Sequence, residues 1–140
     1  MNTLSDNIPD CTIFLLAKAY QKAHARFMSL LQPYGLTSLQ HLVLEALWFQ
    51  AGCTAAELGK LLVLDKATLS GVLDRMVDAG WIEKKRDPAD RRAVRLHPAE
   101  KANRIQDELI ALRVRANDEL LSPFSPEEKL LLKRFLRELM

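Results

Sequence analysis

The chain has 140 residues, of which 49% are hydrophobic and 27% charged, a composition typical of one globular domain. No apolar stretch approaches the roughly 18 to 20 residues that span a bilayer, and no export signal is visible, so we expect a cytoplasmic protein. The formal net charge is only +2, but segment 84–95 holds six basic and two acidic residues. This concentration of charge predicts a segment that binds a polyanion.

The first two predicted elements are helices separated by a proline and a glycine. The first helix ends near Gln32, and its buried face is expected to consist of Ile13, Ala17, Tyr20, His24, Phe27 and Leu31, which recur at helical spacing. Thr37 or Ser38 is expected to cap the second helix, which ends before Gly52. Its predicted buried face consists of Leu39, Leu42, Val43, Ala46 and Leu47.

A short third helix and a longer fourth helix are predicted next. Thr54 and Glu57 fit a reciprocal capping box, and the third helix is expected to turn Leu58, Leu61 and Leu62 inward. Asp65 is expected to cap the fourth helix, with Gly80 as its left-handed terminator. The predicted buried face of the fourth helix consists of Leu69, Val72, Leu73, Met76 and Val77.

Beyond Gly80 the hydrophobic period changes from 3.6 to 2, which predicts a β-hairpin with strands at 81–86 and 92–97. Pro98 is expected to open another long helix. A narrow apolar seam runs along it, made of Ala102, Ile105, Leu109, Leu112 and Ala116. Ser125 and Pro126 predict the start of the last helix, whose apolar positions are Leu131, Leu132, Phe135, Leu136 and Leu139.

This order of elements predicts a mainly α fold, a winged helix-turn-helix between long terminal helices. The fourth helix has the diameter that the DNA major groove admits. The residues expected to contact DNA from it are Lys66, Ala67, Thr68, Ser70, Gly71 and Arg75. The small residues permit close approach, and the two hydroxyl groups can donate to or accept from bases and phosphates. Arg75 is expected to contact a phosphate or to form an ion pair with the hairpin.

The hairpin tip is the predicted minor-groove contact, because a guanidinium group suits a narrow, strongly negative groove. The residues expected there are Arg86, Asp90, Arg91 and Arg92. Since phosphate repels a carboxylate, Asp90 is expected to act internally by holding a neighbouring guanidinium in one rotamer. The alternative is a hairpin whose charges are merely solvated; its position after a helix-turn-helix favours DNA binding.

The chain resembles the MarR family of bacterial and archaeal transcriptional regulators over nearly its whole length. The resemblance rests on LTSLQHLVLEAL at 36–47, TAAELGKLLVLDKATLSGVLDRMVDAGWI at 54–82 and RDPADRRAVRLHPAEKA at 86–102. The D-x-R pattern of that family matches Asp90 to Arg92, whereas HPAE at 97–100 replaces its usual Leu-Thr. The resemblance implies a homodimer that places 66–71 in the major groove and Arg92 in the minor groove of double-stranded DNA.

In this reading the whole chain, 1–140, is one MarR-type domain. Residues 1–35 and 98–140 supply dimerisation helices, and residues 36–97 form the DNA-binding part. The sequence independently favours a dimer. Two DNA-binding parts about 34 Å apart can bind the two half-sites of a palindrome, and the apolar faces of the terminal helices need another surface to cover them. The alternative is that these seams pack on each other within a monomer.

Many members of the family release DNA when a small aromatic anion binds, so we expect a repressor with a small-molecule effector. His24, Phe27, His41 and Trp48 are the residues expected to line its pocket, with aromatic walls and a switchable donor. The alternative for the aromatic residues is core or interface packing, and for the histidines a satisfied polar contact.

Cys11 offers a second mode of control. It precedes the first helix, where the organic-hydroperoxide-sensing branch of the family also has a cysteine, and a helix N-terminus favours the oxidisable thiolate. That branch has tyrosines where this chain has Ser38 and His41, which weakens the parallel. The alternative is an inert Cys11, and Cys53 is expected to be structural.

Enzymatic activity is not expected, because no nucleophile motif, phosphate loop or paired catalytic carboxylates are visible. The two cysteines and three histidines have no metal-ligand spacing, so neither a metal nor a cofactor is expected. A winged-helix module that binds an acidic protein instead of DNA is the remaining alternative. DNA affinity that falls steeply with salt would separate the two functions.

Overall fold

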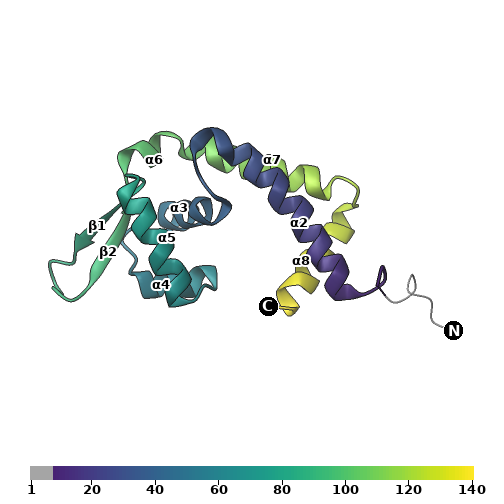
Figure 1. Ribbon diagram of the computed structural model, residues 1–140, viewed down its shortest axis with the longest axis horizontal. Coiled ribbons are helices and arrows are strands. Elements are labelled where there is room, and N and C mark those ends of the chain that lie inside the picture. The colour runs from purple at the N-terminus through teal and green to yellow at the C-terminus, as the bar shows by residue number, and fades with distance from the viewer. Residues whose placement is uncertain (1–7) are drawn as a thin grey trace. The chain divides into compact units, whose positions relative to one another are not determined.

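The computed structural model describes residues 8–140, which form two compact units: residues 8–27 with Ala111–Met140, and Met28–Ile110. Of the predicted dimerisation segment 1–35, residues 1–7 lie outside the described residues. In chain order the elements are α2 (Thr12–Leu31), the 3-10 turn η1 (Gln32–Tyr34), α3 (Ser38–Phe49), α4 (Ala55–Leu62), α5 (Lys66–Asp78), β1 (Ile82–Arg86), β2 (Val94–Pro98), α6 (Glu100–Arg104), α7 (Gln106–Leu121) and α8 (Pro126–Glu138) (Figure 1). The predicted fold class, mainly helical with a β-hairpin wing, is confirmed.

Three helix starts use the reciprocal capping box that satisfies otherwise unpaired amide groups of the first turn. At α4 the hydroxyl of Thr54 accepts from the N–H of Glu57 at 3.2 Å, and the Glu57 carboxylate accepts from the N–H of Thr54 at 3.0 Å. The same pairs form at α3, between Thr37 and Gln40, and at α8, between Ser125 and Glu128. The predicted starts of these helices are confirmed.

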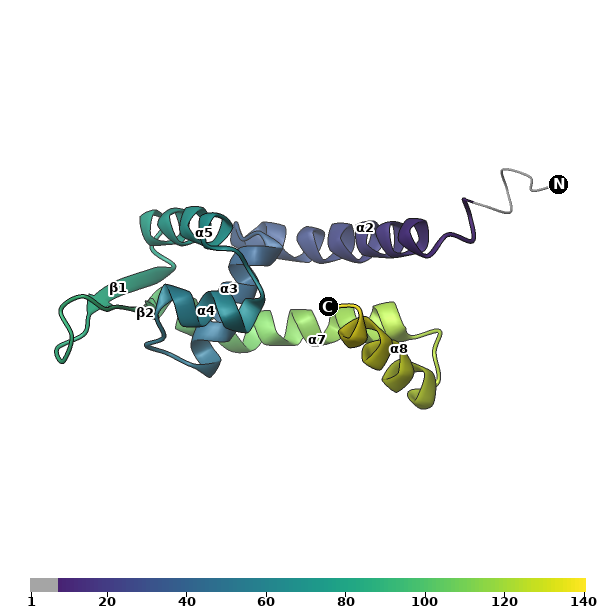
Figure 2. The ribbon, with the colours of Figure 1, turned by 90° about the horizontal axis from the view of Figure 1, so that it is seen from below.

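The hairpin is attached by its backbone to the loop between α3 and α4. β1 and β2 pair antiparallel, with Lys84 opposite Leu96. On its other side Leu96 bridges to Cys53: the N–H of Gly52 donates to the carbonyl of Leu96 at 2.8 Å, and the N–H of Leu96 donates to the carbonyl of Cys53 at 2.9 Å. The base of the hairpin is therefore held against the helix-turn-helix, while its loop extends away from the helices of this unit (Figure 2).

The core of the unit Met28–Ile110 differs from the predicted core at single positions. Leu42 is 42% exposed and Leu61 is 47% exposed, whereas Leu44 and His41 are completely buried. Successive helix residues are rotated by about 100°, so a buried arc centred on 43, 44 and 47 leaves Leu42 on the opposite side of α3. The apolar residues buried in this unit are Leu31, Leu36, Val43, Leu44, Ala46, Leu47, Cys53, Leu58, Leu69, Val72, Leu73, Met76, Ile82, Leu96, Ala99, Ala102 and Leu109.

The expected helix start at Pro98 is wrong. Pro98 is the last residue of β2 and lies opposite Ile82, and the helix begins two residues later at Glu100. A proline is compatible with a strand end, because its missing N–H is not needed there. The expected single helix is also interrupted at Ile105, whose φ of −108° and ψ of 11° separate α6 from α7.

The other unit consists of α8 and the parts of α2 and α7 within 8–27 and 111–121. Arg26 on α2 donates to the Glu119 carboxylate on α7 at 3.2 Å. Much of the apolar surface of this unit is exposed: Ile13 at 79% and Tyr20 at 65% belong to the face expected to be buried. On α8 the exposed apolar residues are Leu130, Leu131, Phe135 and Leu136. None of the helices within residues 8–140 combines the length and apolar character needed to cross a membrane.

Candidate nucleic-acid interface

The N-terminus of α5 is capped by Asp65. Its Oδ1 accepts from the N–H of Thr68, and its Oδ2 accepts from the Thr68 hydroxyl, both at 2.8 Å. The amide bond first, and then the hydroxyl bond, hold the pKa of Asp65 below its usual value. Because the hydroxyl proton of Thr68 points to Asp65, this hydroxyl can act toward DNA only as an acceptor. The expectation that it could also donate is wrong for this rotamer.

The outward face of α5 carries small side chains between two basic residues, and the helix also exposes the acidic residues Asp74 and Asp78. Lys66, Ala67 and Ser70 are exposed, whereas the opposite face buries the residues of the core. The Arg75 guanidinium lies next to Gly71: a Cβ placed on that glycine would lie 3.5 Å from Nη1. The six residues predicted to contact DNA thus lie on one helix. Apart from Lys66 and Arg75, none of the six has a side chain longer than that of threonine.

The ion pair expected between Arg75 and the hairpin does not form. The preceding residue, Asp74, instead accepts from Lys84 Nζ of β1 at 3.2 Å. Both side chains are exposed, so this pair stabilises the structure only weakly. The Arg75 guanidinium lies instead beside Gly71 of its own helix.

The C-terminus of α5 is attached to α6 through Lys101. Gly80 has a φ of +78°, a left-handed conformation that suits a residue without a side chain. The Lys101 ammonium group donates to the Ala79 carbonyl and lies 4.1 Å from the ring centroid of Trp81. A cation is favourable at the negative end of a helix dipole and over an indole face. Both ends of α5 are therefore held by side chains.

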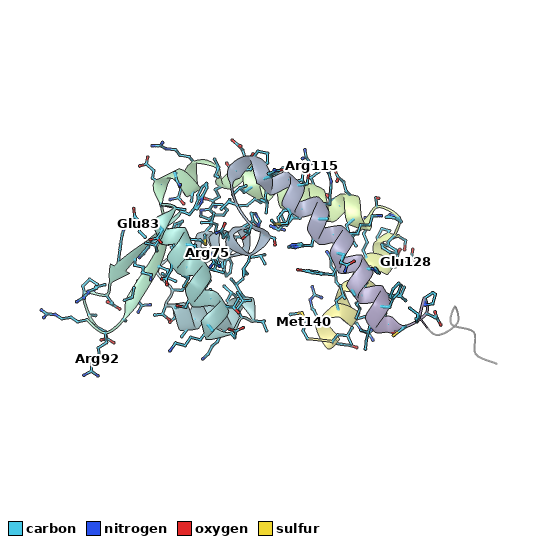
Figure 3. All side chains as sticks on the ribbon, in the orientation of Figure 1. Arg75, Glu83, Arg92, Arg115, Glu128 and Met140 are labelled. Carbon is cyan, nitrogen blue, oxygen red and sulfur yellow. The ribbon has the colours of Figure 1, made fainter. Side chains whose placement is uncertain are left out.

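At the hairpin tip the predicted arginines are exposed, and Arg92 points away from the loop into solvent (Figure 3). The expectation that Asp90 holds a guanidinium group is wrong. Asp90 instead shapes the backbone: its Oδ1 accepts from the N–H of Arg92 at 3.0 Å, and its carbonyl accepts from the N–H of Ala93 at 3.0 Å. A short aspartate side chain favours such local bonds to nearby amides. The turn is thus built by Asp90, and the two arginine side chains project from it.

The carboxylate that does hold an arginine is Asp87, which the sequence analysis did not single out. Its Oδ2 accepts from Nε and Nη2 of Arg95 at 3.1 and 3.0 Å, and its Oδ1 accepts from the N–H of Ala89 at 2.9 Å. The amide bond first, and then the arginine, hold the pKa of Asp87 below its usual value. The only signal in the sequence is that the two residues flank the loop and carry opposite charges.

The four residues predicted to line an effector pocket fall in different units. His24 stacks on Tyr20 with ring centroids 5.2 Å apart, in the same unit as Phe27. His41 and Trp48 belong to the other unit. His41 is fully buried, with Nε2 at 3.3 Å from Glu45 Oε2, and Trp48 Nε1 donates to Asn103 Oδ1 at 2.9 Å.

A groove of about 840 Å³ lies elsewhere, between α4, α5 and the hairpin, and none of those four residues lines it. Its lining is Ala55, Ala56, Gly59, Lys60, Val63, Leu64, Lys66, Leu69, Ser70, Leu73, Asp74, Lys84, Val94 and Leu96. Lys66 and Ser70 therefore belong both to the groove and to the predicted DNA-binding face.

The two cysteines differ in environment. Cys11 is exposed immediately before α2. Cys53 is buried, and burial first, then the Glu57 carboxylate, raises the pKa of its thiol, which keeps it protonated and unreactive. Within residues 8–140, no three His, Cys, Asp or Glu side chains gather in a way that could hold a metal ion.

Comparison with known proteins identifies related sequences. The sequence profile of the MarR family matches residues 34–93. The HTH-type transcriptional regulator YsmB of Bacillus subtilis is 31% identical over 110 residues, which cover 79% of this chain and 75% of that protein. The regulator TtmR of Methylorubrum extorquens is 34% identical over 96 residues, which cover 66% of this chain and only about half, 49%, of that protein.

Solved structures extend the likeness to the whole fold. The structure of BpsR of Bordetella bronchiseptica, described as showing how 6-hydroxynicotinic acid regulates its DNA binding, has a TM-score of 0.87 at 26% identity and covers 95% of both chains. A mutant of Escherichia coli MarR in complex with operator DNA has a TM-score of 0.85 at 26% identity, covering 100% of this chain and 99% of that one.

Proposed function

Because the chain belongs to the MarR family of transcriptional regulators, we propose that it is a sequence-specific regulator of double-stranded DNA rather than an enzyme. One observation carries the proposal: a capped helix with small exposed side chains between Lys66 and Arg75, and a hairpin with two exposed arginines at its tip, are held on one compact unit. A helix of this kind suits the major groove and an arginine-tipped wing suits the minor groove.

The residues assigned to DNA are those of α5 and of the hairpin tip. From α5 they are Lys66, Ala67, Thr68, Ser70, Gly71 and Arg75, and from the hairpin Arg86, Arg91 and Arg92, with Asp90 shaping the turn. The protein acts as a homodimeric repressor on a palindromic operator in the cytoplasm. The exposed apolar residues of α2 and α8 support a second copy as partner.

The test is fluorescence-anisotropy titration of DNA from upstream of the coding region at two salt concentrations. We expect salt-sensitive binding, because phosphate contacts release counterions, and we expect Arg92→Ala to weaken it by about ten-fold or more. Arg104→Ala is the charge-matched control, since Arg104 forms an exposed pair with Glu100 on α6 at 2.8 Å. If the protein binds neither this upstream DNA nor any sequence in a selection from random DNA, the alternative of a winged-helix module that binds an acidic protein is favoured.

We further propose that a small aromatic or other organic anion releases the DNA. BpsR is a relative whose DNA binding responds to such a compound. Two places are proposed for the effector. One is the surroundings of His41 and Trp48, the two residues of the predicted set that share a unit with α5; His24 and Phe27 belong to the other unit. The other is the groove, where an anion near Lys66 and Ser70 would compete directly with DNA. Titration of the protein–DNA complex with 6-hydroxynicotinate or benzoate distinguishes the two places. Loss of the compound's effect in Trp48→Phe supports the first place, and loss in Lys84→Ala supports the groove.

The alternative control is oxidation of Cys11, which would make the protein a peroxide-responsive repressor in a stress response. The exposure of its thiol supports this alternative. Cys11→Ser should then retain DNA binding after treatment with an organic peroxide, whereas the wild type loses it. Equal loss in both proteins would exclude Cys11 as the sensor.

A further inference from the structure

Arg95 is one of the six basic residues of segment 84–95, yet its guanidinium group is not directed toward solvent as that of Arg92 is. Its Nε and Nη2 donate to Asp87, and its Nη1 donates to the carbonyl of Gly52 at 3.0 Å. A further carboxylate, Glu57 at the start of α4, lies 3.9 Å from Nη1. Three donors of this guanidinium are thus used within the protein.

The two sides of this contact belong to different parts of the DNA-binding unit. Asp87 opens the loop of the hairpin and is bonded within it twice more: its Oδ1 accepts from Ala89, and its N–H donates to the Ala93 carbonyl at 3.0 Å. Gly52 lies in the loop between α3 and α4, next to the backbone bridge of Cys53 to Leu96. Arg95 therefore connects the hairpin loop to the body of the helix-turn-helix.

We propose that Arg95 is a positioning residue, which holds the loop 87–93 in the orientation that presents Arg91 and Arg92 to DNA, and does not itself bind DNA. The backbone bridge fixes only the base of the hairpin, so the loop needs a side-chain connection of its own. A guanidinium supplies it because its planar fork can bond a carboxylate and a carbonyl at once, which an ammonium group does not reproduce. This inference rests on the proposed DNA binding.

The first test asks whether the effect of Arg95 passes through the tip arginines. We expect Arg95→Ala to weaken DNA binding by about ten-fold in the wild-type background. In a protein that already carries Arg91→Ala and Arg92→Ala, the same substitution should change the dissociation constant by less than about two-fold, since coupled residues are not additive. Equal factors in the two backgrounds would overturn the proposal, because Arg95 would then act on DNA independently.

The second test separates charge from geometry. Arg95→Lys retains the positive charge, so a residue that merely attracts phosphate would tolerate it; we expect binding to weaken nearly as much as in Arg95→Ala. Asp87→Asn leaves every hairpin arginine in place, and we expect it to weaken DNA binding as well. Arg104 on α6, an exposed basic residue outside segment 84–95, provides the control Arg104→Gln. Full binding by Arg95→Lys would contradict the proposal.

A third readout needs no DNA. Trypsin cleaves after arginine, and a loop released from Asp87 and Gly52 should be cut faster after Arg91 or Arg92, as intact-mass analysis of the fragments would show. We expect at least several-fold faster cleavage in Arg95→Lys and Asp87→Asn, measured well below the melting temperature of each variant, and wild-type cleavage in Arg104→Gln. Unchanged cleavage would overturn the proposal. Faster cleavage in a protein that binds no DNA would instead overturn the proposed function while leaving the loop attachment intact.

Discussion

The indole N–H of Trp48 on α3 donates to Oδ1 of Asn103 on α6 at 2.9 Å, a hydrogen bond between two residues that lie 55 positions apart in the sequence. We predict that Asn103→Ala lowers the free energy of unfolding by about 1 kcal/mol, the usual net contribution of such a bond. Chemical unfolding monitored by circular dichroism measures it.

The control variant replaces Trp48, the hydrogen-bond partner of Asn103. Trp48→Phe should destabilise by a similar or larger amount, and adding Asn103→Ala to it should cost less than in the wild type, since the bond is already lost. If the two losses add fully, the hydrogen bond does not contribute to stability in solution.

Val63 at the C-terminus of α4 has a φ of 55°, the only positive φ of a non-glycine residue among those described. This conformation is costly for a β-branched residue, and the side chain is 69% exposed, so little burial compensates. We predict that Val63→Gly raises the free energy of unfolding by about 1 kcal/mol. Val63→Ala, which keeps a Cβ, should raise it less. A loss of stability in the glycine variant would show that contacts of Val63 outweigh the strain.

The lowered pKa of Asp65 makes the cap of α5 dependent on pH. A carboxylate whose pKa is depressed by folding adds stability above its unfolded pKa, about 3.9, and this stability is lost as the pH falls through the lower folded pKa. We predict that Asp65→Ala lowers the melting temperature at neutral pH, and that the difference from wild type shrinks as the pH falls below the unfolded pKa of about 3.9. Asp78→Ala, at the other end of α5, is the control. A difference independent of pH would contradict a role for the ionised carboxylate.

The exposed apolar residues of α8 predict association of two chains. Leu131 is 45% and Phe135 48% exposed, one turn apart on the same face. We expect light scattering after size exclusion to give twice the mass of the chain, and Leu131→Glu with Phe135→Glu to give the monomer mass. Lys129→Glu on the same helix should leave the dimer intact. A monomeric wild type would overturn the proposed homodimer.

Local features were predictable from the sequence alone. Capping residues such as Thr54 with Glu57, the terminator Gly80 and the change of period at the hairpin all act within a few neighbouring residues. The order of elements therefore followed, and with it the fold class and the location of the basic segment. The resemblance to the MarR family added the homodimer, with 66–71 in the major groove and Arg92 in the minor groove.

Contacts between distant segments were decided by tertiary structure. Whether Asp87 or Asp90 holds an arginine depends on the path of the loop, and that Arg95 reaches Gly52 depends on how β2 packs beside the α3–α4 loop. Similarly, Asp74 rather than Arg75 meets the hairpin, and Leu42 rather than His41 faces outward. Sequence spacing places a residue on a face of its own helix, but only packing determines which face is buried and which charges come within bonding distance.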